Sequence, residues 1–114
     1  MYAFRGTHLL LDYYNVDPVV ANDINYVEVA LRNSIQEAGF TLINIVSSKF
    51  EPQGLSTVAL LEESHVSIHT YPEKKSMFID IFTCGDGVPD DINRLLSIAF
   101  KPHRINITKI IRGE

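Results

Sequence analysis

The chain has 114 residues, a length that predicts a single domain with a small hydrophobic core. Hydrophobic residues make up 46% of the chain, which argues against a disordered protein. Ten Lys and Arg residues against 14 Asp and Glu residues give a net charge of −4. This balance argues against a nucleic-acid partner, because nucleic acids attract basic surfaces.

The cysteine content and the length of the apolar runs favour a reducing compartment inside the cell. The single cysteine, Cys84, cannot form a disulfide within the chain, which is typical of a reducing environment. The first residues lack the basic-then-apolar order of a signal peptide, and the apolar runs are too short to span a bilayer. We therefore expect a soluble cytoplasmic protein with no membrane partner.

The first third of the chain predicts a strand followed by a helix. Residues 3–14 contain aliphatic and aromatic runs that favour a strand. Asp17 before Pro18 is a typical helix start, since the carboxylate caps the helix and proline fits its first turn. Apolar residues then recur at spacings of three and four, which predicts one helix that ends at Gly39. They are Val20, Ile24, Val27, Leu31, Ile35 and Ala38.

The middle of the chain predicts three strands. Residues 41–50 are rich in β-branched side chains, a turn follows at 51–54, and residues 55–62 form the next strand. Residues 64–70 alternate between apolar and polar side chains, as a half-buried strand does. The two sets are Val66, Ile68 and Thr70 on one face and His65, Ser67 and His69 on the other.

The last third predicts a strand, a helix and a final strand. Residues 77–84 alternate, residues 105–111 favour a strand, and Pro89 and Pro102 are placed to begin and end the helix between them. The whole order predicts an α/β fold of the α+β type, a two-layer sandwich with an antiparallel sheet and two helices on one face. The other face would carry His65, His69, Phe82 and Cys84. We expect a second subunit to cover part of this face, because such a mixture makes a poor solvent surface.

Taken alone, the polar residues of the middle strands have ordinary interpretations. Ser64 is most often a strand-start hydroxyl, and Cys84 a small buried residue. His65 and His69 would form a metal pair on a helix, but on a strand they lie too far apart to share a metal easily. We therefore expect no metal site.

Several blocks, taken in order, resemble the pyruvoyl-dependent S-adenosylmethionine decarboxylases of the short prokaryotic type. They are residues 6–9 (GTHL), 49–56 (KFEPQGLS), 63–73 (ESHVSIHTYPE), 80–85 (DIFTCG) and 100–102 (FKP). The chain departs from the family pattern at Thr7, where arginine is usual, and at Tyr71, where many members have tryptophan.

The resemblance implies an enzyme that makes its own cofactor. Autocatalytic cleavage between Glu63 and Ser64 would leave a beta chain, 1–63, and an alpha chain, 64–114, whose first residue becomes a covalent pyruvoyl group. Ser56 and His69 are similar to the family's residues that assist processing. An imidazole suits this role because it exchanges protons near neutral pH. Cys84 is similar to the proton donor of the decarboxylation step.

The resemblance also implies a substrate, S-adenosylmethionine. Phe50 matches an aromatic residue that stacks on the adenine, Tyr71 is a candidate second ring, and Glu73 matches a carboxylate that binds the ribose hydroxyls. The product would be the aminopropyl donor of spermidine biosynthesis, and the enzyme a homodimer of processed protomers with active sites near the interface. Two alternatives stay open. One is a pyruvoyl decarboxylase of ornithine or arginine on the same scaffold, and the other a non-catalytic small-molecule-binding domain in which Ser64 never reacts.

Overall fold

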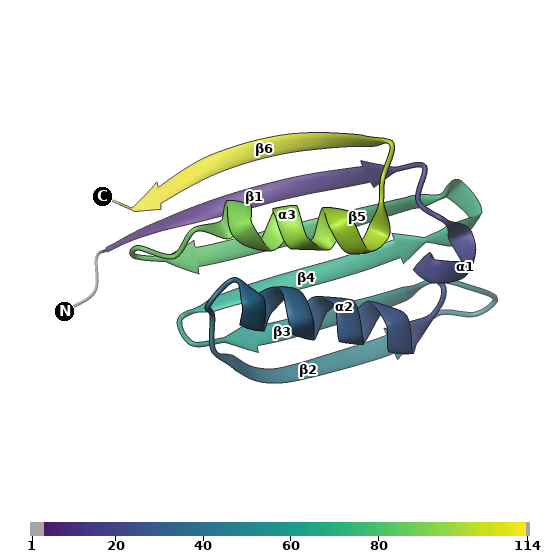
Figure 1. The fold of residues 1–114 in the computed structure, drawn as a ribbon, viewed down its shortest axis with the longest axis horizontal. Helices are drawn as coiled ribbons and strands as arrows, with labels where there is room; N and C mark the ends of the chain where they lie inside the picture. The colour runs from purple at the N-terminus through teal and green to yellow at the C-terminus, as the bar shows by residue number, and fades with distance from the viewer. Residues whose placement is uncertain (1–3, 114) are drawn as a thin grey trace.

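A computed structural model describes residues 4–113, which form a two-layer sandwich with one six-stranded antiparallel sheet (Figure 1). The strands are β1 (Arg5–Tyr14), β2 (Leu42–Lys49), β3 (Leu55–Leu61), β4 (Ser64–Tyr71), β5 (Ser76–Cys84) and β6 (Arg104–Gly113), in the spatial order β2-β3-β4-β5-β1-β6. The helices are α1 (Pro18–Ala21), α2 (Ile24–Glu37) and α3 (Pro89–Phe100), with a short 3-10 turn, η1, at Pro72–Lys74. This architecture confirms the predicted fold class. Ala3, where the first strand was expected to begin, lies outside the described residues.

The first predicted helix is in fact two helices, so the expectation of one continuous helix from Pro18 to Gly39 was wrong. The Asp17 carboxylate caps α1 by accepting the backbone N–H of Val19 across 2.9 Å. The Asp23 carboxylate then caps α2 by accepting the N–H of Tyr26 across 3.1 Å. A second capping side chain allows a new helix start with the backbone donors satisfied, although the apolar spacing runs on across the break.

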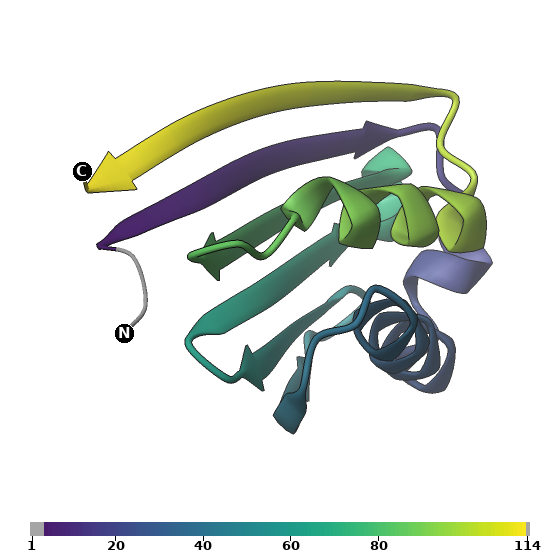
Figure 2. The same ribbon diagram turned by 60° about the vertical axis from the view of Figure 1, so that its left-hand side comes forward.

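Both long helices cover the same face of the sheet (Figures 1 and 2). Val27, Leu31 and Ile35 of α2 are fully buried against the sheet, and Ile92 and Leu96 of α3 join the same core. Each such side chain contributes about 1.5–3 kcal/mol by leaving water. Among residues 4–113, the two long helices thus cover one face of the sheet.

A buried tyrosine ties β1 to α3 within this core. The Tyr13 hydroxyl donates to Oδ1 of Asn93 across 2.6 Å. Burial raises the pKa of the Tyr13 hydroxyl above its usual range, because the charged phenolate would lose its hydration. The hydroxyl is therefore a neutral donor over the ordinary pH range.

The second face of the sheet, which we call the open face, has no helix among residues 4–113 packed on it. The alternation predicted for β4 is confirmed: Val66, Ile68 and Thr70 are fully buried, and His65, Ser67 and His69 are partly exposed. The open face also carries exposed apolar side chains, among them Val46, Val58 and Leu60 at 63%, 44% and 52% exposure. No helix in the described part of the chain is long and apolar enough to cross a membrane.

Candidate active site

The Glu63–Ser64 bond lies in the tight turn between β3 and β4. Leu61 pairs directly with Ser64, so only two residues make the turn. Glu63 adopts a left-handed backbone conformation, with φ at 59°. This region costs a residue with a side chain about 1–2 kcal/mol. The bond that precedes Ser64 is therefore held in a strained segment without the glycine that usually relieves such strain.

The Ser64 hydroxyl is buried and held against the end of β5. Ser64 is only 8% exposed, and its Oγ accepts a hydrogen bond from the backbone N–H of Cys84 across 3.3 Å. The structure thus brings together Ser64 and Cys84, which are 20 residues apart. A backbone donor at this position can also stabilise negative charge that develops on an oxygen near Ser64.

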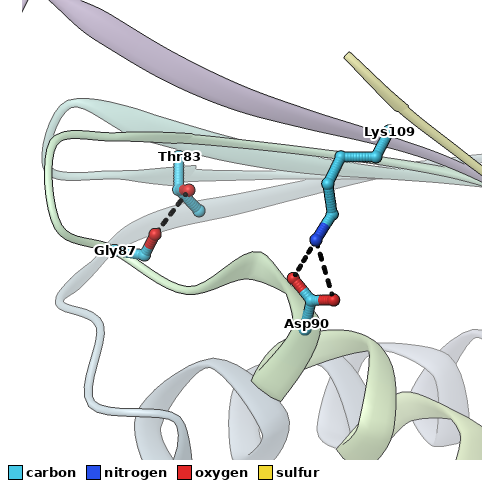
Figure 3. Close-up of polar contacts among 4 residues, drawn as sticks. All are labelled: Thr83, Gly87, Asp90 and Lys109. Atoms are coloured by element: carbon cyan, nitrogen blue, oxygen red, sulfur yellow. Dashed lines mark hydrogen bonds and ion pairs between the residues drawn. The ribbon is translucent and has the colours of Figure 1, made fainter. Parts of the chain in front are cut away.

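The turn after Cys84 is fixed by hydrogen bonds on both sides. The backbone N–H of Gly85 donates to the carbonyl oxygen of Arg5 across 3.0 Å, and that of Gly87 donates to the carbonyl oxygen of Cys84 across 3.3 Å. Oγ1 of Thr83 donates to the carbonyl oxygen of Gly87 across 3.1 Å, the hydrogen bond drawn as a dashed line in Figure 3. The backbone at Cys84 is therefore held by hydrogen bonds to the start of β1 and within its own turn.

A cavity of about 390 Å³ opens beside Cys84, within the size range of small-molecule sites. Phe4, Gly6, Phe82 and Arg112 are among the residues that line it. The ring of Phe82 leans over Gly6, where any Cβ would overlap it. The missing side chain at Gly6 is thus what allows the ring to form this wall.

Ser56 and His69 form a second pair. They are direct neighbours across β3 and β4, and the Ser56 Oγ lies 2.7 Å from the Nδ1 of His69. The hydroxyl donates to the ring when this nitrogen is unprotonated. A serine and an imidazole in such contact can pass a proton between them.

The two pairs lie far apart within one protomer. His69 is five residues along β4 from Ser64, a separation of about 17 Å at the rise of an extended strand. Ser56 lies beside His69 and is equally distant. The structure therefore does not bring Ser56 or His69 to the Ser64 hydroxyl of the same chain.

The three substrate-binding candidates lie at the His69 end. Phe50, which is 40% exposed, follows β2, and its ring lies close to Gly54, as do the Thr70 carbonyl and Pro72. Tyr71 packs on Phe78 with the ring centroids 5.3 Å apart. Glu73 is exposed in η1, the turn that follows β4. All three thus lie at the end of the sheet that carries the Ser56–His69 pair, away from Ser64.

Residues 4–113 contain no group of three or more His, Cys, Asp or Glu side chains placed to hold a metal ion. His65 instead packs beside Phe82 and His8, with ring centroids 5.8 and 6.3 Å away.

The family model described as S-adenosylmethionine decarboxylase matches residues 7–113 of this sequence. The chain belongs to the S-adenosylmethionine decarboxylase family. The resemblance stated from the sequence blocks, and the carboxy-lyase class expected with it, are confirmed.

Relatives of this decarboxylase family cover almost the whole chain. An S-adenosylmethionine decarboxylase proenzyme 2 of Bacillus cereus is 38% identical over 114 residues, which is 98% of this chain and 92% of the relative. An S-adenosylmethionine decarboxylase proenzyme of Methanococcus maripaludis is 38% identical over 109 residues, covering 95% and 89%.

Solved structures of decarboxylases share the fold. The adenosylmethionine decarboxylase of Aquifex aeolicus superposes with a TM-score of 0.90 at 31% identity, covering 96% of this chain and 91% of that one. The Trypanosoma brucei delta26 monomer superposes with a TM-score of 0.62 at 16% identity, over 89% of this chain and 44% of that one, and shows the fold alone.

Phe4 and Arg112 line the cavity of this family member, although the sequence alone did not predict that they would. Arg112 reaches the cavity because β6 pairs with β1, which in turn pairs with β5. A cation close to the end of the last strand was visible in the sequence, but its neighbours across the sheet were not.

Proposed function

We propose that the chain cleaves itself between Glu63 and Ser64 and then decarboxylates S-adenosylmethionine. The observation that carries this proposal is the buried Ser64 hydroxyl, held by the Cys84 N–H directly after the left-handed Glu63. A pyruvoyl group in this position supplies an electron-accepting carbonyl for loss of carbon dioxide from an amine substrate.

The proposed cleavage passes through an ester and then a dehydrated residue. The Ser64 Oγ attacks the Glu63 carbonyl carbon, the C–N bond breaks, and an ester joins Glu63 to Ser64, whose amine is now free. A base removes the Ser64 α-proton, and the main-chain carboxylate of Glu63 leaves from the Cβ of Ser64. Water then hydrolyses the dehydrated residue and releases ammonia, which leaves the ketone. The products are residues 1–63 and a blocked 64–114.

We propose that a homodimer assembles each complete site from two protomers. Ser64 with Cys84, and Ser56 with His69, are two half-sites about 17 Å apart on one chain. The Ser64 side chain lies on the helix-covered side of β4, so a two-fold related partner packed on the open face places its Ser56–His69 pair beside the backbone of Ser64. The apolar Val58 and Leu60 on that face suit burial between two sheets.

In this arrangement each residue has a defined role. His69, assisted by Ser56, takes the α-proton during cleavage, and the Cys84 thiol returns a proton to the substrate carbon after carbon dioxide leaves. Phe50 stacks on the adenine, Tyr71 packs beside it, and Glu73 accepts the ribose hydroxyls. Ornithine and arginine have neither adenine nor ribose, which favours S-adenosylmethionine. We further propose a cytoplasmic location and a role in spermidine biosynthesis.

Subunit complementation tests this proposal. Ser64→Ala and His69→Ala are expected to be inactive alone, whereas co-expression gives mixed dimers with one complete site. Random pairing predicts about a quarter of the wild-type carbon dioxide release. The matched control, Ser64→Ala with Cys84→Ala, removes residues of the same half-site and stays inactive. No recovery from folded Ser64→Ala and His69→Ala chains would refute the shared site. Wild-type assays with S-adenosylmethionine, ornithine and arginine in parallel identify the substrate.

A further inference from the structure

Arg112 lies in line with Cys84 across the sheet. Gly6 of β1 pairs with Cys84 of β5 on one side and with Arg112 of β6 on the other. These three residues therefore share a face, and the middle one has no side chain. Glycine leaves room there for the Phe82 ring, so the arginine side chain meets this ring and not a side chain of β1.

The guanidinium is directed over β1 toward the thiol's strand. Its Cζ lies 5.4 Å from the ring centroid of Phe82, the ring that leans over Gly6. This cation–π contact restrains a side chain that would otherwise be mobile. The Lys109 Nζ also lies 3.2 Å from both Asp90 oxygens, which ties the strand that carries Arg112 to the start of α3 (Figure 3).

The cavity beside Cys84 favours an anion. Its described lining contains Arg5 and Arg112 and no acidic residue. Arg5 precedes Gly6, so strand alternation directs its side chain to the helix-covered face. Of the two arginines in the cavity lining, Arg112 is therefore the one on the face that carries Cys84.

We propose that Arg112 binds the carboxylate of the substrate's amino-acid group and so determines its specificity for an α-amino acid. This inference rests on the proposed function. The substrate α-amine must reach the carbonyl formed from Ser64, the neighbouring α-carbon must reach the Cys84 thiol, and the carboxylate is one bond from that α-carbon. A guanidinium can bind a carboxylate through two parallel N–H donors. The positive charge of Arg112 also repels the substrate sulfonium. This repulsion directs the sulfonium end of the substrate toward the partner's Phe50 and the partner's Glu73.

The expected kinetic effect follows from the chemistry. The carboxylate is bound before reaction and leaves as carbon dioxide, so its ion pair is not stronger in the transition state. Such an interaction lowers KM without raising kcat. The decarboxylated product lacks the carboxylate and does not use Arg112.

Arg112→Met is the test, with Arg104→Met as the matched control. Arg104 lies on the same strand and face, its Cζ 4.2 Å above the Tyr14 ring, at the opposite end of β6. Arg112→Met is expected to raise KM about 10- to 100-fold with kcat nearly unchanged, and Arg112→Lys less so. Arg104→Met is expected to leave KM unchanged.

Binding provides a readout that is independent of turnover. Processed enzyme is treated with borohydride to reduce the carbonyl, and calorimetry measures the Kd of S-adenosylmethionine and of its decarboxylated product. Arg112→Met is expected to weaken only the former. Equal weakening of both ligands, or no change in either, overturns the proposal, and Arg112→Lys serves if the methionine variant is unfolded. Failure of the proposed function is seen separately, as a wild-type chain that neither cleaves nor releases carbon dioxide.

Discussion

The backbone N–H of Cys84 donates to the Oγ of Ser64 across 3.3 Å, which joins the proposed cleavage site to the proposed proton donor. Because the donor is a backbone group, the bond does not depend on the side chain at position 84. The same segment can therefore serve cleavage through its N–H and turnover through its thiol.

Cys84→Ala separates these two uses. Cleavage is expected to continue, because the N–H remains, while turnover falls about 10²- to 10⁴-fold through loss of the proton donor. Mass spectrometry follows the fragments, and carbon dioxide release follows turnover. Ser67→Ala, on the same open face, is the control and should turn over normally. A Cys84→Ala enzyme that is cleaved and as active as wild type would contradict the role of the thiol.

Val58→Glu tests the covering of the open face. A buried carboxylate between two sheets loses hydration without a partner charge, so we expect monomers in sedimentation and loss of activity. Val29→Glu is the control, because Val29 is similarly exposed, at 51%, but lies on α2. Circular dichroism checks that both variants fold. Dimers of Val58→Glu, or monomers of Val29→Glu, would show that the open face is not the interface.

Gly6→Ala tests the wall of the cavity. Its Cβ would overlap the Phe82 ring, so we expect a loss of about 1–3 kcal/mol in the free energy of unfolding and a displaced ring. Phe82→Leu in the same chain makes room and should recover part of that loss, which urea titrations of both single variants and the double variant measure. Strictly additive effects would mean that the two residues do not touch.

Tyr13→Phe tests the buried hydroxyl of β1. Loss of the bond to Asn93 should cost about 1 kcal/mol at neutral pH. Burial raises the pKa of Tyr13, so above about pH 10 the unfolded chain releases this proton while the folded chain keeps it. The contribution of the Tyr13 hydroxyl to the free energy of unfolding is thus fully present below about pH 10 and declines above it. Urea unfolding between about pH 8 and about pH 11 should show a shallower decline for Tyr13→Phe, and parallel curves would contradict the buried neutral tyrosine.

Much of the fold follows from local patterns in the sequence. The alternation of Val66 and Ile68 with His65 and His69 has the two-residue period of a strand, so the buried and open sides of β4 were predictable. The break before Asp23 was not, because the apolar spacing of an α-helix runs across it while the decision is made by one capping carboxylate.

The sequence blocks supply the residues of the candidate site, whereas their geometry comes only from the fold. Ser64, Cys84, Ser56 and His69 were all identified from the sequence blocks, and the strand rise already separates Ser64 from His69 by about 17 Å. The neighbours of Cys84 depend on which strands pair. Arg112 meets the cavity only through the pairing of β1 with β6, a contact between opposite ends of the chain.

The most direct test of self-processing is the intact mass of purified wild-type protein after long incubation, beside Ser64→Ala. Self-cleavage predicts a fragment of residues 1–63 and a fragment of 64–114 that lacks a free amine and is lighter by one ammonia than the serine-started peptide. Ser64→Ala should stay one chain of 114 residues. A wild-type chain that also remains whole, or one cut at another bond, would contradict the central role assigned to Ser64.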